Sequence, residues 1–430
     1  MRFLCAGKDD FIREQFFIRI FYRYRLMRII IIGAGAAGCF AAINIKRNQP
    51  DAVVTVLESG RKPLAKVAVT GGGRCNLTNS FADVKSLDKV YPRGGRLMKR
   101  LLREFSHEDT CAWFEREGVR LVTQEDQCVF PKSQDAMEIV NTLMRLMGRL
   151  GVVVKTGHRV ERIEKRDGMF VVGMADESIK ELTADAVVVT TGGGQTASAF
   201  RMLDGLDLEI VPPVPSLFSL CLPGNPVTDM MGTVVEDAAV SLAGTKFKAQ
   251  GPLLVTHWGM SGPAILKLSS YAARWLNERD YKATLLVNWM SGSNESQVLE
   301  QLQEYCVLHK NKQLSNVYPQ QLNSRLWHFL ILSSKLSPEI RWGELGRKGL
   351  NRLVCTLTNQ EFRVDGKNRF KDEFVTCGGI ALSNVNPSTL ECRTCPGLYF
   401  AGEVLDVDAV TGGFNLQAAW TMGYVVAKNL

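Results

Sequence analysis

Short apolar runs rich in β-branched residues recur along the chain, and they predict the strands of a buried sheet. They occupy residues 28–32, 51–58, 185–194 and 397–403, and glycines follow three of them closely. Continuous apolar runs of this length are typical of parallel strands that are covered on both faces. The pattern therefore predicts an α/β fold around a central sheet.

Other periodicities surround these runs. Apolar positions at helical spacing follow two of the strands, at residues 39–48 and 416–430, whereas residues 157–189 alternate as expected for a β-meander. The middle of the chain, residues 196–374, begins with strands and turns rich in proline and glycine. It continues with amphipathic helices at about 292–350. We therefore expect a second domain with its own strands and helices.

A glycine motif joins the first strand to the first helix, and the following strand ends on Glu58. In a dinucleotide-binding unit, glycines at these places allow a tight turn, the approach of a pyrophosphate and close packing of the helix on the strand. The helix N-terminus attracts the phosphates, and Glu58 can accept both hydroxyls of an adenosine ribose, which favours FAD or NAD over NADP. A glycine turn without a ligand is the alternative. We expect cofactor contacts at Gly33, Gly35, Ala36, Ala37, Gly38 and Glu58.

A second motif, near the C-terminus, distinguishes between these cofactors. The strand at 397–403 ends in an acid, and a glycine pair precedes the last helix. The acid can hold the ribityl hydroxyls of a flavin nucleotide. The helix N-terminus can direct N–H groups at the flavin's pyrimidine edge, where negative charge develops on reduction. NAD enzymes do not need this second site, so we expect non-covalent FAD, with contacts at Gly402, Glu403, Gly412, Gly413, Phe414 and Asn415.

The stretch TGGGRCN at residues 70–76 follows the second strand, in a region that runs under the cofactor in flavoproteins of this fold. Its glycines would let the backbone approach the flavin, while nearby cations and an asparagine would contact the phosphates or the ring. A purely structural turn is the alternative. Cys75 is interpreted as a small buried residue rather than a redox thiol. The remaining cofactor contacts are expected at Lys66, Gly72, Gly73, Arg74, Asn76, Val160, Thr191 and Gly192.

Composition limits the class of protein further. The chain has 430 residues, 46% of them hydrophobic, and a net charge of +8, a length typical of roughly two or three domains. No apolar run approaches the roughly 20 residues of a membrane span. The basic residues are spread out, so we expect a small-molecule substrate and not a nucleic-acid partner. Eleven scattered cysteines predict reduced thiols in the cytoplasm. Nothing in the sequence indicates an oligomeric state.

Residues 1–26 precede the first strand and are basic and aromatic. Arginines interrupt residues 11–26 too often for the apolar core of a signal peptide. Either this extension precedes the functional start at Met27, or it forms a basic amphipathic helix on the surface.

Two residues are candidate catalytic groups. His257 lies inside a motif and has the chemistry of a general acid or base, although a histidine that fixes a turn is the simpler interpretation. Asn76 is the second candidate. Ser261 is expected to cap the helix that follows His257.

Cys392 and Cys395 form a CxxC pair, which in other settings indicates dithiol chemistry. The pair precedes a strand rather than a helix N-terminus, and it lies roughly 23 Å of extended chain from Gly402. We therefore expect no relay to a flavin. No metal site is expected either, because no second pair of ligands accompanies the first.

Three segments together resemble a known flavoprotein family. They are KVAVTGGGRCNLTN at 66–79, LLVTHWGMSGPAIL at 253–266 and GLYFAGEVLDVDAVTGGFNLQAAW at 397–420. From Met27 to Leu430 the chain is similar to the BaiN-like NAD(P)/FAD-dependent oxidoreductases of bacteria. That family includes aminoacetone oxidases and a reductase of unsaturated bile-acid intermediates.

The resemblance implies a Rossmann-like FAD-binding domain in two chain segments, 27–195 and 375–430. An insert at 196–374, with a β-barrel and a helical subdomain, would interrupt it. It also implies an FAD-dependent oxidoreductase that passes hydride between flavin N5 and a small organic substrate. Amine oxidation and NAD(P)H-driven reduction of a C=C bond both remain open, and NAD(P)H would be a transient donor because the insert has no second GxGxxG motif.

A flavin-binding RNA-associated protein or RNA-modification enzyme is the alternative from another class. The chain also departs from the family pattern in two places: Leu64-Ala65 precede Lys66, and Gln127-Cys128 precede Val129. A family arginine is missing at the second place, so no substrate is carried over from the family. The FAD motifs are intact.

Overall fold

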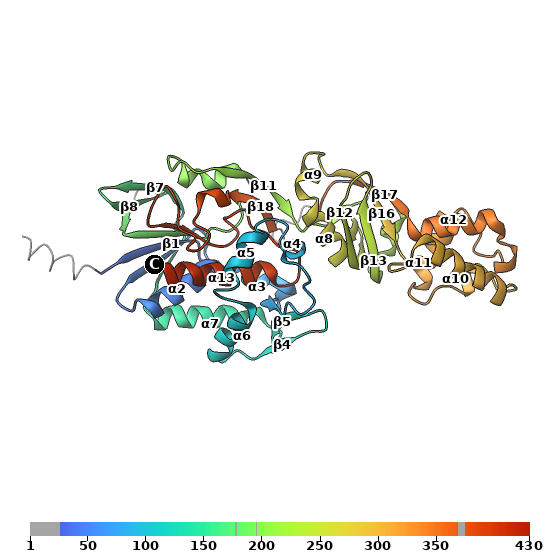
Figure 1. The fold of residues 1–430 in the computed structure, drawn as a ribbon, viewed down its shortest axis with the longest axis horizontal. Helices are drawn as coiled ribbons and strands as arrows, with labels where there is room; N and C mark the ends of the chain where they lie inside the picture. The colour runs from blue at the N-terminus through green and yellow to red at the C-terminus, as the bar shows by residue number, and fades with distance from the viewer. Residues whose placement is uncertain (1–25, 177–178, 195, 369–374) are drawn as a thin grey trace, which may run out of the picture.

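The computed structural model describes residues 26–176, 179–194, 196–368 and 375–430. The molecule is elongated, with a parallel sheet near one end, a six-stranded antiparallel sheet in the middle and a group of helices at the other end (Figure 1). All but the last residue of the expected extension 1–26 lies outside the described residues. So do residues 195 and 374, on which the expected domain boundaries fall, and these boundaries stay predictions.

Five parallel strands form the central sheet in the order β19-β10-β1-β2-β6. Their bounds are β1 (Arg28–Ile32), β2 (Val53–Glu58), β6 (Val153–Thr156), β10 (Ala186–Val189) and β19 (Leu398–Phe400). Leu398 of β19 pairs with Val187 of β10, so the last part of the chain completes the sheet that the first part begins. The predicted Rossmann-like α/β fold in two chain segments is confirmed.

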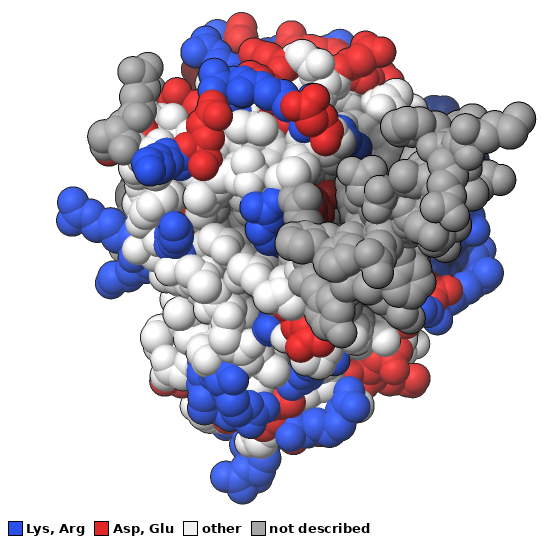
Figure 2. All heavy atoms as spheres, turned by 90° about the vertical axis from the view of Figure 1, so that its left-hand side faces the viewer, with Lys and Arg blue, Asp and Glu red and all other residues white. Residues whose placement is uncertain are grey.

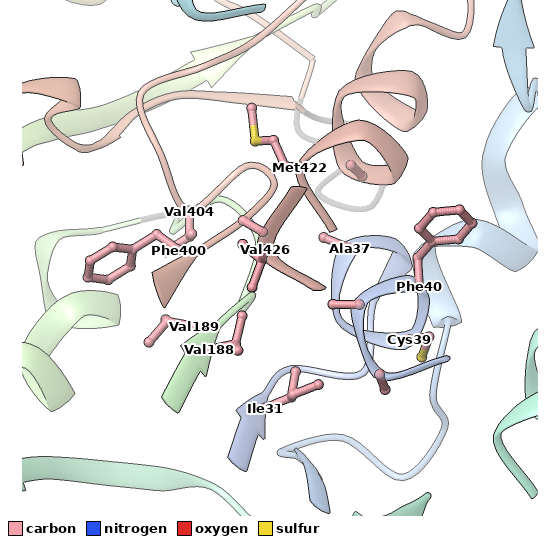
Figure 3. Close-up of a cluster of buried hydrophobic side chains, with 14 of the residues drawn as sticks. Ile31, Ala37, Cys39, Phe40, Val188, Val189, Phe400, Val404, Met422 and Val426 are labelled. Carbon is pink, nitrogen blue, oxygen red and sulfur yellow. The ribbon is translucent and has the colours of Figure 1, made fainter. Parts of the chain in front are cut away.

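Both faces of this sheet are covered, which explains its apolar strands. One face carries α2 (Ala36–Asn48), α7 (Ala136–Arg149) and α13 (Phe414–Asn429), and the other carries the predicted meander (Figure 1). The meander consists of β7 (Val160–Arg166), β8 (Met169–Met174) and β9 (Leu182–Ala184). Figure 3 shows how side chains from β1, β10, β19, α2 and α13 gather into one buried cluster. Burial of this cluster supplies the hydrophobic driving force for joining the two chain segments.

A compact group of short elements separates β2 from α7, and the sequence did not predict it. Its members are α3 (Ala65–Gly73), β3 (Thr78–Asn79), α4 (Leu87–Val90), α5 (Gly95–Leu101), α6 (His107–Arg116), β4 (Leu121–Thr123) and β5 (Cys128–Pro131). The three strands pair in the order β3-β5-β4. This group holds the TGGGRCN stretch against the N-terminal end of α13.

The expected barrel is a nearly closed six-stranded sheet of order β12-β15-β14-β13-β16-β17. Its strands are β12 (Leu220–Cys221), β13 (Val234–Leu242), β14 (Lys248–Thr256), β15 (Gly259–Ser261), β16 (Lys282–Asn288) and β17 (Gln360–Asp365). The edges meet where Cys221 N–H donates to Gly366 O at 3.0 Å and Asn368 N–H donates to Ser219 O at 3.1 Å. The antiparallel pair β11 (Ile210–Ser216) and β18 (Val375–Ile380) connects this sheet to the parallel one.

Helices complete the insert. They are α8 (Pro263–Tyr271), α9 (Ala273–Asn277), α10 (Glu295–Leu308), α11 (Ser324–Ser333) and α12 (Gly346–Thr358). The 3₁₀ turns are η1 (Ala197–Leu203), η2 (Pro226–Met230), η3 (Leu314–Asn316), η4 (Trp342–Glu344) and η5 (Leu382–Asn384). The N-cap of α8 is Gly262 rather than the predicted Ser261, which ends β15. Among the described residues, no helix combines the length and the hydropathy needed to cross a bilayer.

Candidate flavin-binding site

Two glycines of the first motif are required by the fold itself. Gly33 has a φ of +106°, and a Cβ atom there would lie 2.5 Å from Thr190 O. A Cβ atom on Gly38 would lie 2.1 Å from Gly33 O. The Thr190 hydroxyl fixes this turn by donating to Ile32 O at 3.0 Å and to Gly33 O at 2.8 Å. Sequence reasoning named the next residue, Thr191, which is exposed. The signal it missed was Thr190 itself, a threonine at the end of an apolar strand beside the motif.

Gly35 has a different explanation. Its backbone is extended, at φ −84° and ψ −168°, which any residue adopts, and no atom of the described chain lies within 4 Å of a Cβ placed there. It is the N-cap of α2, whose first turn has neither a side-chain cap nor an acid. The N–H groups of Ala36 and Ala37 therefore lack the cap that Ser106 provides to α6. No described contact requires glycine at this position. An anion that approached the helix N-terminus would require it, and the predicted pyrophosphate of FAD fits that role.

Glu58 lies at the carboxyl end of β2, where an adenosine ribose is expected. Its two carboxylate oxygens accept hydrogen bonds from Ala34 N–H at 2.8 Å and Gly60 N–H at 2.7 Å. The Ser59 hydroxyl also donates to Oε1, at 3.3 Å, whereas Oε2 can accept a second hydrogen bond, so the carboxylate is oriented for a ribose hydroxyl. His158 N–H donates to Glu58 O at 2.8 Å, which places the start of β7, Val160, beside this end of the site.

The N-terminus of α13 is joined directly to the TGGGRCN stretch. Gly413, the N-cap of α13, has a φ of +87°, and a Cβ there would lie 2.3 Å from Thr78 O. The Asn76 side chain accepts from Gly413 N–H at 3.2 Å and donates to Thr78 O at 3.0 Å. Asn79 Nδ2 donates to Gly412 O at 3.1 Å. The two motifs that the sequence analysis treated separately thus form one structure, in which Asn76 positions a helix N-terminus.

The glycines of this stretch adopt conformations that other residues rarely take. Helix α3 breaks at Thr70, and Gly71, Gly72 and Gly73 follow with φ values of +58°, +68° and +82°. Cys75 is also left-handed, at φ +60°, and is fully buried. Burial raises the pKa of its thiol to about 12, so the thiol is protonated at neutral pH.

Replacing Cys75 with alanine is expected to change the rate of flavin reduction less than about twofold, since a protonated thiol is a poor nucleophile. The rate is measured by stopped-flow absorbance under argon, with Cys111→Ala as the control for a half-buried thiol outside the motif. A loss of more than tenfold at full FAD content would assign Cys75 a redox role.

Charged residues lie at the carboxyl ends of β10 and β19. Lys66 Nζ is 3.7 Å from Glu403 Oε2, and the lysine side chain is 65% exposed. Glu403 Oε1 accepts from Thr376 N–H at 2.6 Å, which fixes the carboxylate. Arg74 instead turns onto Phe130, with its guanidinium carbon 4.5 Å from the ring centroid. Lys66 is therefore the cation that accompanies the acid predicted to hold the ribityl hydroxyls.

Two further glycines complete this edge of the sheet. Gly192 has a φ of +75°, and a Cβ there would lie 4.0 Å from Glu403 Oε2. Gly402 has a φ of +81°, and a Cβ there would lie 3.0 Å from the Cβ of Ala37 in α2. Both glycines thus keep the backbone close to the elements expected to hold the cofactor.

The last two expected contacts serve the protein's own packing through their side chains. Phe414 is buried, and its carbonyl oxygen accepts from the Tyr91 hydroxyl at 2.9 Å. The Asn415 amide bonds both backbone groups of Ala409, at 2.9 and 3.0 Å, and so fixes the segment that leads into α13. Any contact of these two residues with a cofactor would go through the backbone.

His257 is placed with the barrel rather than with the glycine motifs. It is exposed in the turn between β14 and β15, with its ring centroid 4.3 Å from that of Trp258. The helix that reaches the parallel-sheet domain, α8, begins at the other end of β15. A turn-forming role agrees with this position better than a role at the flavin.

Cys392 and Cys395 are buried free thiols just before β19, at the amino end of a strand whose carboxyl end carries the flavin motif. This placement agrees with the expectation that they form no relay. Among the described residues, no cluster of three His, Cys, Asp or Glu side chains could hold a metal ion.

Sequence reasoning missed a buried ion pair that joins the two chain segments of the parallel-sheet domain where this domain meets the insert. Arg93, which follows α4, pairs with Asp408 through two nitrogens, and Asp408 is completely buried. Arg93 also donates to Ser270 O of α8 at 2.9 Å, and the Ser216 hydroxyl of β11 donates to Asp408 at 2.9 Å. Burial disfavours the charge on Arg93, but Asp408 outweighs it and raises the pKa of Arg93. The signal in the sequence was Asp408, an acid that lies within the apolar segment VLDVDAV at 404–410 and therefore needs a buried partner.

The fold and the site define a class of protein. A two-segment dinucleotide-binding fold with a second, C-terminal half-site is that of an FAD-dependent oxidoreductase. A family model described as "HI0933-like protein Rossmann domain" matches residues 27–429, and the chain belongs to this family. The predicted family and enzyme class are thereby confirmed.

Curated relatives cover nearly the whole chain. A 3-dehydro-bile acid delta(4,6)-reductase of Clostridium scindens is 29% identical over 93% of this chain and 98% of its own. A ribosomal RNA dihydrouridine synthase of Escherichia coli is 27% identical over 93% of this chain and 97% of its own. Among solved structures, a 3-ketosteroid-delta4-(5alpha)-dehydrogenase from Rhodococcus jostii is 14% identical, with a TM-score of 0.49 over 94% of this chain and 97% of its own.

Proposed function

We propose that the protein reduces a C=C bond conjugated to a carbonyl group, with NAD(P)H as the transient electron donor. The relatives support this choice, because the names delta(4,6)-reductase and dihydrouridine synthase both denote saturation of such a bond. A carbonyl stabilises the negative charge that forms when hydride adds to the far carbon. Two electrons and one proton leave NAD(P)H as hydride, one substrate carbon receives a hydride, and its neighbour takes a proton from solvent.

The observation that carries the proposal is the N-terminus of α13. Its N-cap, Gly413, offers no side-chain acceptor, and its first turn contains no acid. Asn76 holds this helix end against the TGGGRCN stretch. Bound FAD supplies hydride transfer at N5. The positive end of the α13 dipole would stabilise the negative charge that develops on the flavin's pyrimidine edge on reduction. Lys66 adds a second positive group at the same sheet edge.

The test is the visible spectrum of the FAD-loaded protein under argon. NADH or NADPH is expected to bleach the flavin, and an unsaturated 3-oxo bile acid or uridine-containing RNA is expected to restore the colour. If neither nicotinamide bleaches the flavin and aminoacetone does, the enzyme is an amine oxidase instead. A protein that binds no FAD on reconstitution would overturn the cofactor assignment as well.

RNA uridine is a second candidate substrate, favoured by a specific observation. Two ribosomal RNA dihydrouridine synthases, from Escherichia coli and Haemophilus influenzae, match 93% of this chain. This support runs against the sequence-based expectation of a small-molecule substrate and no nucleic acid. On the face at the parallel-sheet end, Lys and Arg are interspersed with Asp and Glu around a largely uncharged middle (Figure 2). We therefore place the proposed RNA contact at the junction of the domains.

We also propose that the protein acts in the cytoplasm.

A further inference from the structure

A cavity of about 690 Å³ lies where the parallel-sheet domain meets the barrel. Residues Asp88 and Lys89 of α4 form one wall. The opposite wall consists of β13, β14 and β16 with two residues of α8, Lys267 and Tyr271, and the end of α12 closes it. This volume falls within the usual range for ligand sites, which often lie between domains.

Three lysines from three elements line the cavity. Lys89 comes from α4, Lys248 from the start of β14 and Lys267 from α8. None of them forms an ion pair within the described part of the chain. Asp88 is the carboxylate among the described lining residues, and Asp237, which accepts from the Gln250 amide at 3.1 Å, adds a second negative charge nearby, so the three lysines still outnumber the acids. The cavity therefore has an uncompensated positive charge.

Neutral polar groups complete the lining. They offer both donors and acceptors and come from Ser241, Gln250, Tyr271, Asn288, Thr358 and Asn359. Such a mixture suits a ligand that carries anionic groups together with hydroxyl or amide groups. Gln250 and Tyr271 already bond within the protein, to Asp237 and to Lys89 O, but a purely apolar ligand would leave the lysines without partners.

The cavity is connected to the flavin motif by a short chain of contacts. The Tyr271 hydroxyl donates to Lys89 O at 2.9 Å, which joins α8 to α4 across the junction. The preceding residue, Ser270, accepts from Arg93, and Arg93 pairs with Asp408 on the segment leading to α13. A ligand in the cavity would therefore contact both domains, and these contacts link it to the segment that leads into α13.

We propose that this cavity binds the phosphate groups of a nucleotide substrate, with Lys89, Lys248 and Lys267 as the phosphate contacts. Lysine binds phosphate as a point charge, and three lysines on separate elements suit a ligand with several negative charges, as phosphates supply, better than a single carboxylate. The proposal rests on the proposed function, since the bound nucleotide would carry the reducible base. The phosphates belong to a polynucleotide or to a free mononucleotide, and binding distinguishes these two sources.

The experiment measures binding separately from catalysis. Fluorescence anisotropy of a labelled oligouridylate is recorded over a salt series with the FAD-loaded parent, Lys248→Gln/Lys267→Gln and Lys246→Gln. Lys246 is an exposed lysine on the neighbouring hairpin and lies outside the cavity lining, so it is the matched control. The double variant is expected to bind about tenfold more weakly, with the slope of log K against log salt reduced by about 0.7 per lysine. The control is expected to match the parent.

Competition with UMP identifies the source of the phosphates. Displacement of the oligonucleotide by UMP, lost in the double variant, assigns the cavity to a single nucleotide; displacement only by longer RNA assigns it to a polynucleotide. The proposal is overturned if the double variant binds the oligouridylate with the parent's affinity and salt slope and releases it to UMP as the parent does. NADPH-driven bleaching needs no uridine nucleotide substrate, so failure of the reductase proposal appears there, while failure of the phosphate site appears only in the anisotropy.

Discussion

Gly35→Val is expected to give a folded protein that retains little or no FAD, whereas Gly38→Ala is expected to lower the free energy of unfolding by about 3 kcal/mol. The two glycines belong to one motif but differ in their surroundings. A Cβ on Gly38 would lie 2.1 Å from a backbone oxygen, and neither helix α2 nor the β1 turn can move away without disturbing the core. The extended backbone of Gly35 and the open space beside it tolerate a larger side chain. That side chain would occupy the approach to the α2 N-terminus.

Thermal unfolding and the flavin absorbance of reconstituted protein separate these outcomes. Gly148→Ala is the control, because Gly148 is an exposed glycine of α7 with free space for a Cβ. Alanine there is expected to raise stability by up to about 1 kcal/mol without affecting FAD content. If Gly35→Val retains FAD with the parent's affinity, the pyrophosphate does not approach the backbone at α2, and the assignment of this site fails.

The features that could be predicted from the sequence depend on local rules. Apolar runs such as residues 28–32 indicate buried strands, and the spacing of Gly33, Gly35 and Gly38 is set by one turn and one helix. The role of Glu58 could also be predicted, because its place at the end of a strand fixes its position relative to the glycine turn. Each of these inferences needs only neighbours in the chain or the regular geometry of a βαβ unit.

The features that could not be predicted depend on contacts between distant segments. The hydrogen bond between Asn76 and Gly413 joins opposite parts of the chain, and no periodicity marks it. The same holds for the closing of the barrel at Cys221 and Gly366. The cavity between α4 and the barrel is formed by side chains whose spacing in sequence follows no rule. Substrate-binding groups are generally of this second kind, which explains why the cofactor motifs were found more readily than the proposed phosphate site.

Arg93→Met is expected to lower the free energy of unfolding by about 3–5 kcal/mol at neutral pH and to reduce FAD content. The substitution leaves the carboxylate of Asp408 buried, with Ser216 as its remaining side-chain hydrogen-bond partner in the described part of the chain, and a buried charge without its counter-ion is strongly destabilising. Asp408 lies on the segment between Glu403 and Gly413, so loss of its anchor also loosens the start of α13. Thermal unfolding and flavin absorbance measure both effects, with the exposed Arg96→Met as the control.

The pH dependence distinguishes loss of charge pairing from loss of packing. Burial raises the pKa of Asp408, an effect that Arg93 opposes in the parent protein. A carboxyl group whose pKa is higher in the folded than in the unfolded state favours folding at low pH, and this contribution is lost as pH rises through the folded value. The deficit of Arg93→Met is therefore expected to shrink as the pH falls and Asp408 becomes protonated. The double variant Arg93→Met/Asp408→Leu is expected to recover much of the stability at neutral pH. A deficit that stays constant with pH and persists in the double variant would show that Arg93 acts through its packing alone.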